Sequence, residues 1–166
     1  SNGLLRLAAL TGVGRYEVKL RPSERVLMGD LVVQLREQLL ASTDDPSVRR
    51  LFPPAYPDDP ERDAGYQVLT RDELLEHRLA ALDTVEESLD GDELDDEGLR
   101  AWMSTLNSLR LVLGTRLDVD EELPALADDD PLAPAYAVYE YLGGLLSPVV
   151  DGLSRDLPPP SPDAGI

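Results

Sequence analysis

The chain has 166 residues, of which 33 are Asp or Glu and 15 are Lys or Arg, so its formal net charge is −18. This length suffices for one domain with a sizeable core. The absence of cysteine excludes a disulfide scaffold, a thiolate zinc site and a thiol nucleophile within this sequence, and the negative charge argues against direct contact with nucleic acid or an anionic membrane.

The sequence predicts one folded unit with short extensions. Residues 1–3 resemble a tag remnant, residues 4–157 are expected to form a single helical domain, and the Pro-rich residues 158–166 a disordered tail. No run approaches the roughly 20 apolar residues that cross a bilayer, and no secretory signal pattern opens the sequence. These features predict a cytoplasmic protein.

Residues 4–20 are expected to form a β-hairpin. Two apolar runs, 4–10 and 16–20, flank a Gly-containing link at 11–15, and the second run alternates apolar and charged residues. An isolated hairpin is marginally stable in water, so it should pack on the helical remainder.

The next segments predict one long helix, one short helix and a loop. Pro22 suits a first helical turn, and apolar residues then recur at steps of three and four toward Ser42: Val26, Leu27, Leu31, Val32, Leu35 and Leu39. A short helical segment is expected over 47–52. Four prolines between 53 and 60 predict irregular structure through residue 65.

Two further helices are predicted in the middle of the chain. Thr70 and Glu73 fit a capping box, which indicates a helix from Thr70 to about Leu89. Its inner face is expected to carry Leu74, Leu75, Leu79, Leu82 and Val85. Asp95 or Asp96 is expected to cap a central helix, whose apolar stripe comprises Leu99, Trp102, Met103, Leu106, Leu109, Leu113 and Leu117.

A last helix is predicted from Ala135 to about Leu157, with a kink at Pro148. Three apolar residues near this kink are candidates for self-association: Leu145, Leu146 and Val149. The predicted fold class is mainly α, a bundle of about four main helices with a small N-terminal β-hairpin.

The sequence offers no catalytic, metal or cofactor motif, so we expect a protein that is not an enzyme and binds no cofactor. His77 is the sole imidazole and is expected to be a solvated helix residue. The acidic runs beginning at Asp90 and Asp118 lack the Gly and Glu positions of an EF-hand loop. The Gly12–Gly14 segment lacks the third glycine of a dinucleotide fingerprint.

Charged residues inside the central apolar helix are the most unusual feature of the sequence. Asn107, Arg110 and Gly114 fall on one helix face, and Arg116 lies two residues further on. One interpretation is structural, with an arginine bonding a neighbouring helix while Gly114 permits close approach. The other is an anion or ligand site.

The segment from Trp102 to Leu117 resembles the signature of an actinobacterial family of unknown function, number two thousand and seventeen, which includes an actinomycete oxidative stress regulator. The resemblance extends to the hairpin, to the helix start at 22–25 and to residues 137–143. Ser108 replaces an acidic residue of the family pattern, and Tyr141 a frequent tryptophan. The motif residues of structural, partner or ligand interest are Trp102, Asn107, Arg110, Gly114, Thr115, Arg116 and Tyr139.

The resemblance implies redox-linked regulation of transcription through protein contacts, and members tend to be encoded beside a Clp protease adaptor. A cysteine sensor belongs to that role, but this sequence has no cysteine. The preferred hypothesis is a non-enzymatic regulatory or adaptor protein. Its acidic surface would meet a protein partner such as a sigma factor, another transcription component or a Clp-linked protein.

The alternative is a small-molecule or anion binding protein, or a weak enzyme, with a site around Asn107, Arg110 and Arg116. Either hypothesis is compatible with a homo-oligomer.

Overall fold

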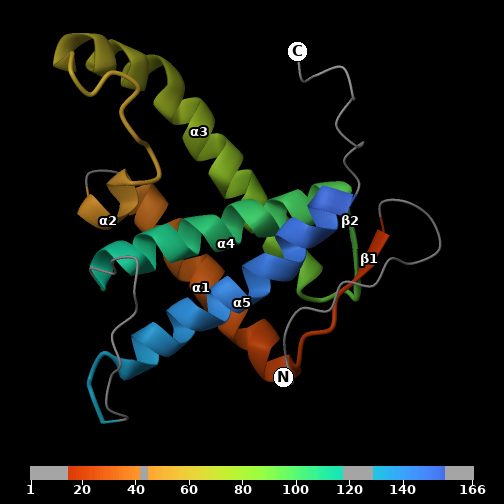
Figure 1. The fold of residues 1–166 in the computed structure, drawn as a ribbon. Coiled ribbons are helices and arrows are strands. Elements are labelled where there is room, and N and C mark those ends of the chain that lie inside the picture. Colours follow the sequence, from red (N-terminus) through yellow and green to blue (C-terminus); the bar gives the residue numbers. More distant parts are fainter. Residues whose placement is uncertain (1–14, 42–44, 118–128, 156–166) are drawn as a thin grey trace, which may run out of the picture.

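The computed structural model describes residues 15–41, 45–117 and 129–155. The described residues form five helices and two short strands (Figure 1), which confirms the mainly α prediction. The predicted tag remnant, the first predicted strand and the Pro-rich tail lie outside the described ranges. The elements in chain order are β1 (Arg15–Glu17), α1 (Pro22–Ala41), α2 (Pro46–Arg49), α3 (Pro60–Ser88), β2 (Glu93–Asp95), α4 (Asp96–Arg116) and α5 (Ala133–Arg155).

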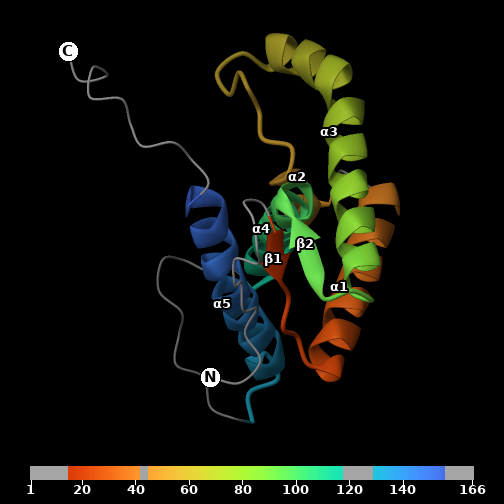
Figure 2. The ribbon, with the colours of Figure 1, turned by 90° about the vertical axis from the view of Figure 1, so that its right-hand side faces the viewer.

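Helix α4 is the central helix, as predicted. It lies between α5 on one side and α1 and α3 on the other (Figure 2), and it contacts each of these helices as well as α2 and β2. The Asp95 side chain accepts a hydrogen bond from the Gly98 amide at 2.7 Å, so it is Asp95, of the two predicted candidates, that caps the helix. The fully buried side chains around α4 include Trp102, Leu99 and Leu106.

The small sheet joins the start of the described chain to the segment between α3 and α4. Strand β1 pairs antiparallel with β2, with Tyr16 opposite Leu94. Residues directly opposite each other on paired strands point to the same face of the sheet. The Tyr16 and Leu94 side chains therefore face the core together, and both are buried. The strand lies in the predicted hairpin region, but the partner observed among the described residues comes from a distant part of the sequence.

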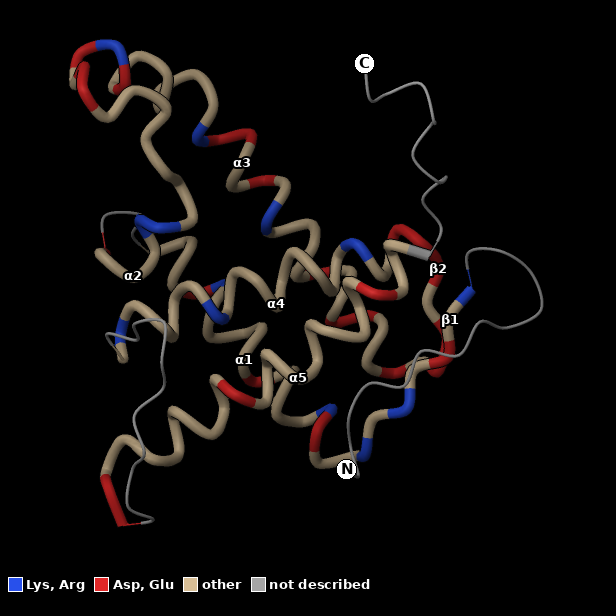
Figure 3. The backbone as a smooth tube through the Cα atoms, viewed as in Figure 1, with Lys and Arg blue, Asp and Glu red and all other residues tan. Residues whose placement is uncertain are grey.

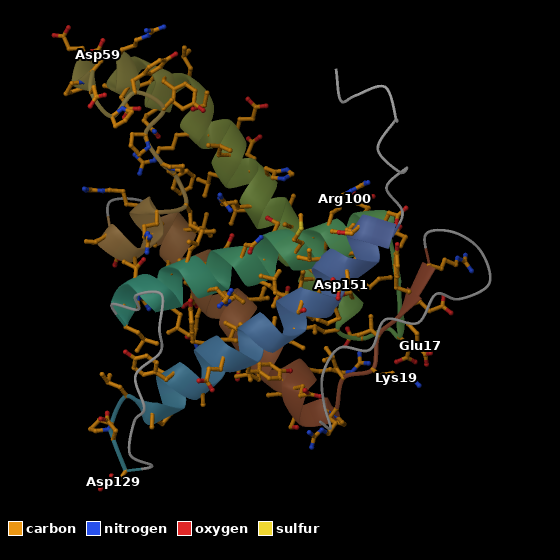
Figure 4. All side chains as sticks on the ribbon, viewed as in Figure 1. Glu17, Lys19, Asp59, Arg100, Asp129 and Asp151 are labelled. Carbon is orange, nitrogen blue, oxygen red and sulfur yellow. The ribbon has the colours of Figure 1, made fainter. Side chains whose placement is uncertain are left out.

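Helix α3 begins ten residues before its predicted start. The predicted irregular structure is confirmed for residues 53–59, but its extension through residue 65 and the cap at Thr70 are wrong. Asp59 caps the helix by accepting from the Arg62 amide at 3.2 Å, and Pro60 occupies the first turn, where the missing N–H costs nothing. The Thr70 hydroxyl instead donates to the Tyr66 carbonyl at 2.8 Å within the helix. The outer half of α3, which begins beside Asp59, extends away from the other helices (Figure 4).

The segment before α3 packs back onto this outer half. The Tyr56 and Tyr66 rings meet edge to face at 6.1 Å between centroids, and the Arg62 guanidinium lies 4.1 Å from the centre of the Tyr56 ring. The Asp63 carboxylate accepts from the Ala55 amide at 2.8 Å. Local contacts therefore stabilise this extension, although the main core does not reach it.

The structure corrects two predicted apolar surfaces. Val26 belongs to the apolar series predicted for this helix, but its side chain is exposed, whereas Met28, outside that series, is fully buried. Leu145 and Val149 were candidates for self-association, but both are fully buried and Leu146 packs against the core. The Leu145 and Val149 side chains are therefore not available at the surface for self-association. Within the described segments, none of the helices combines the length and apolar character needed to span a bilayer.

Candidate functional site

Trp102 joins α4 to the end of α3. Its side chain is fully buried, and its indole N–H donates to the Ser88 hydroxyl oxygen at 2.9 Å. Ser88 in turn donates to the Val85 carbonyl at 2.6 Å, so the polar edge of the indole is satisfied within the core. Trp102, the first residue of the signature, therefore stabilises the packing of α4 against α3.

Arg110 packs against α5. Its guanidinium carbon lies 4.7 Å from the centre of the Tyr139 ring, a distance typical of a cation–π contact. The flat group also lies against the backbone of Gly143, where an added Cβ would come within 3.4 Å of it. The Arg110 Nε atom is buried and has no hydrogen-bond partner among the described residues.

Gly114 lies against the same aromatic ring. A Cβ at this position would lie 3.2 Å from the Tyr139 ring carbon Cε2, closer than most real Cβ contacts. Arg110 and Gly114, four residues apart on α4, thus both contact Tyr139 of α5. Helices α4 and α5 therefore approach closely at Gly114, as the structural interpretation of the sequence predicted.

Thr115 and Arg116 contact the α2 region. Arg116 Nε donates to the Ser47 hydroxyl oxygen at 3.3 Å, and Arg50 donates to the Thr115 hydroxyl oxygen at 3.2 Å. Asp45, which caps α2, has a pKa below its usual range. Hydrogen bonds from Ser47 are the main cause, and the positive charge of Arg116 adds to them.

Asn107, Arg110 and Arg116 do not converge on one site. Asn107 is exposed, Arg110 lies against α5, and Arg116 lies beside α2. A cavity of about 60 Å³ lies between α1, α4 and α5, and of these three residues only Arg116 lines it. It is lined by Leu31, Gln34, Leu35, Gln38, Leu109, Val112, Leu113, Arg116 and Leu142. That volume holds a few water molecules.

His77 is exposed on α3, as the sequence predicted for a solvated residue. It lines a pocket of about 230 Å³ between α3 and α4 together with Glu97, Arg100 and Ser104. Within the described part of the chain, no group of three His, Asp or Glu side chains could hold a metal ion.

Sequence reasoning missed Arg78, which is partly buried beneath α2. It donates to the Ser108 hydroxyl oxygen and to the Leu51 carbonyl, each at 2.9 Å, and burial lowers its pKa. No carboxylate of the described residues forms an ion pair with it. Neither periodicity nor a local motif marks Arg78, since its acceptors are 27 and 30 residues away in sequence.

Arg25 was also missed as an individual residue. It donates to three backbone carbonyls, of Leu20 at 3.2 Å, Leu89 at 2.6 Å and Gly91 at 2.7 Å, and its Nη2 lies 3.2 Å from a carboxylate oxygen of Asp92. This arginine fixes the turn after α3 against the start of α1. The resemblance to the family at residues 22–25 includes Arg25, and this was the signal in the sequence that could have identified it.

Tyr141 connects α5 to the start of α1. Its hydroxyl donates to Glu24 Oε1 at 2.9 Å, while Glu24 Oε2 accepts from the Arg21 amide at 2.7 Å. Burial, followed by the neighbouring Glu24, raises the pKa of Tyr141 above its usual range.

Acidic residues gather in two parts of the described chain (Figure 3). One is the outer half of α3, with the segment before it. The other runs from the end of α3 through β2 to the start of α4, and comprises Asp83, Glu86, Glu87, Asp90, Asp92, Glu93, Asp95, Asp96 and Glu97. Arg25 and Arg36 pair with members of this second group.

Comparison with known proteins identifies the family. The model for a domain of unknown function, DUF2017, matches residues 8–153, so the chain belongs to that family, as its signature indicated. No solved structure matches the chain.

Curated relatives of the chain are named as oxidative stress regulators. The chain is 32% identical to the putative oxidative stress regulator AosR of Mycobacterium leprae over 117 residues, which cover 60% of this chain and 54% of that protein. It is 34% identical to the oxidative stress regulator AosR of Mycobacterium tuberculosis over 116 residues, covering 59% and 53%. The chain thus spans about half the length of these relatives.

Proposed function

We propose that this member of the DUF2017 family is a non-enzymatic regulatory protein that acts by binding another protein. The observation that carries the proposal is the placement of its polar signature residues. Trp102, Arg110 and Arg116 bind neighbouring elements of the fold, and the three candidate ligand residues do not share a pocket. The names of the relatives favour a role in regulation under oxidative stress.

The partner we propose is a basic protein, such as a sigma factor, another transcription component or a Clp-linked protein. A net charge of −18 attracts such a partner over a distance and makes the association rate sensitive to salt. The trigger differs from thiol oxidation in this sequence, because it contains no cysteine. The proposal places the protein in the cytoplasm with its partner.

The test is affinity capture from an actinobacterial lysate, with and without peroxide, at low and high salt. An unrelated protein of similar size and negative charge serves as the control bait. We expect a transcription or protease component to be enriched over the control and then to bind the purified chain saturably. No protein enriched above the acidic control would contradict the proposal.

The alternative function is binding of a small anion at Arg116, beside the cavity lined also by Gln34 and Gln38. Thermal shift with a set of small carboxylates and phosphates tests it. Stabilisation that Arg116→Gln abolishes, with no captured protein, would replace the regulatory proposal by this one.

A further inference from the structure

Helix α1 carries apolar side chains on two different sides. Its inner side buries Met28, Val32, Leu35 and Leu39 in the core. Its outer side exposes three large apolar residues: Val26 at 65%, Val33 at 42% and Leu40 at 64%. At 3.6 residues per turn, the centres of the two sets lie about 130° apart around the helix, so the two sets face different directions. Burial in this fold accounts for the first set only.

The three exposed apolar residues are aligned along one side of α1. Val26, Val33 and Leu40 are spaced by seven residues, so they lie on one face and span about 21 Å along the helix at 1.5 Å per residue. Asp30 and Glu37 lie between them on the same face, and both are exposed. We call these five residues the outer stripe of α1.

One apolar residue in every seven keeps a row on one side of a helix, along which a second helix can lie. The row is less apolar than the seam of a coiled coil, because Gly29 and Arg36 occupy its second position. Single exposed apolar residues are common on protein surfaces and carry no meaning alone. Three in register on the outside of a helix whose inner side already fills the core are a different case. The pattern indicates a second helix lying along α1.

The charges around the stripe specify the character of that helix. Asp30 and Glu37 are acidic, and the nearby Arg36 donates to Asp83 at 2.8 Å and to Glu86 at 3.2 Å, so its charge is already balanced. A second copy of the chain would bring the same carboxylates and another net charge of −18 to this surface. A helix with Lys or Arg beside its apolar residues complements both features.

We infer that the outer stripe of α1 is the docking surface for a basic amphipathic helix of the partner protein. The inference rests on the proposed function and adds where the partner binds and what it presents. Val26, Val33 and Leu40 would contact its apolar face, and Asp30 and Glu37 its cationic side chains.

The direct test uses a fluorescein-labelled helical peptide of about 21 residues, with Leu at heptad a and d positions and Lys at e and g, measured by fluorescence anisotropy. The triple variant Val26→Ser, Val33→Ser, Leu40→Ser keeps every charge of the chain. We expect it to bind the peptide at least about ten-fold more weakly, as the loss of three apolar contacts implies. The variant Asp30→Asn, Glu37→Gln should bind about three-fold more weakly and show a smaller salt dependence.

A matched control comes from the outer half of α3, where Val68 and Leu69 are 80% and 81% exposed. The variant Val68→Ser, Leu69→Ser removes apolar surface of the same kind at another acidic place, and should bind the peptide like the unaltered chain. An equal loss of affinity in this control and in the triple variant would overturn the inference, because binding would then be unspecific. A dimer in sedimentation that the triple variant dissociates would also overturn it, in favour of a second copy.

The inference and the proposed function fail in different ways. If the triple variant captures the same lysate partner as the unaltered chain, the stripe is not the docking surface, while the regulatory proposal stands. If the unaltered chain captures nothing above the acidic control, the proposed function itself fails. Loss of the captured partner in the triple variant alone, with retention in the α3 control, supports both.

Discussion

Helices α4 and α1 both depart from a simple amphipathic pattern. The unusual residues of α4 contact neighbouring parts of the fold, whereas those of α1 remain exposed to solvent. In α4 they are arginines inside apolar sequence, and Arg110 and Arg116 contact the neighbouring elements α5 and the α2 region. In α1 they are apolar residues on the solvent side, and Val26 and Leu40 stay exposed. The charged residues that attract attention in the sequence thus contact neighbouring elements of the fold, and the valines and leucine exposed on α1 form the candidate contact surface.

Replacing Trp102 would break the structural side of this comparison most severely. Trp102→Ala removes a fully buried indole and its bond to Ser88, and we expect a loss of about 3–5 kcal/mol in the free energy of unfolding. Urea denaturation followed by circular dichroism measures it. A loss below about 1 kcal/mol would show that α4 is not the centre of the core.

Ser108→Ala tests the contact that sequence reasoning missed. It removes an acceptor from the partly buried guanidinium of Arg78, and we expect a loss of about 1–3 kcal/mol, the cost of an unsatisfied buried polar group. Ser108→Asp should recover stability, because a carboxylate there faces an arginine without an ion pair among the described residues. Equal stability of the unaltered chain and the alanine variant in denaturant titration would contradict this account.

The contact between Arg110 and Tyr139 should be worth about 0.5–2 kcal/mol. A double-mutant cycle with Arg110→Met and Tyr139→Leu isolates that coupling energy from the packing lost by each single change. Arg110→Lys should not restore it, since a lysine lacks the planar group that stacks beside Gly143. Additive effects would return Arg110 to the list of ligand candidates.

Tyr141 gives a small pH-dependent effect. Its pKa is raised in the folded chain, so its contribution to stability is complete below the unfolded pKa of about 10 and is lost as the pH rises above it. Tyrosine in an unfolded chain titrates between about pH 9.5 and about pH 11.5. Across this range, we expect the melting temperature of the Tyr141→Phe variant to fall less than that of the unaltered chain. Parallel curves for the two proteins would contradict the prediction.

The outer stripe of α1 should have the smallest effect on stability. Val26→Ser, Val33→Ser and Leu40→Ser alter exposed side chains, and each should change the free energy of unfolding by no more than about 0.5 kcal/mol. Thermal denaturation of the single variants measures it. A large loss would show that these residues support the fold, and would remove the contrast with α4.

Local sequence rules predicted the helices with clear signals and failed where a distant contact or an early cap decided the outcome. The cap at Asp95 and the burial of the α4 stripe follow from local pattern. The start of α3 was misplaced, because Pro60 was read as a breaker although a proline is also a good first residue after the Asp59 cap. The contact between Arg78 and Ser108 had no local signal at all.

The amino-acid sequence by itself determined the helical class, the central position of α4 and the exclusion of thiol chemistry, because periodicity, capping and composition are local properties. The tertiary structure alone decided which apolar face of α1 meets the core and which is left outside. It also decided that Arg110 stacks on Tyr139 instead of facing a ligand. Both outcomes depend on the packing of helices that are distant in sequence, and a helical pattern specifies the spacing of residues but not the neighbour that each face will meet.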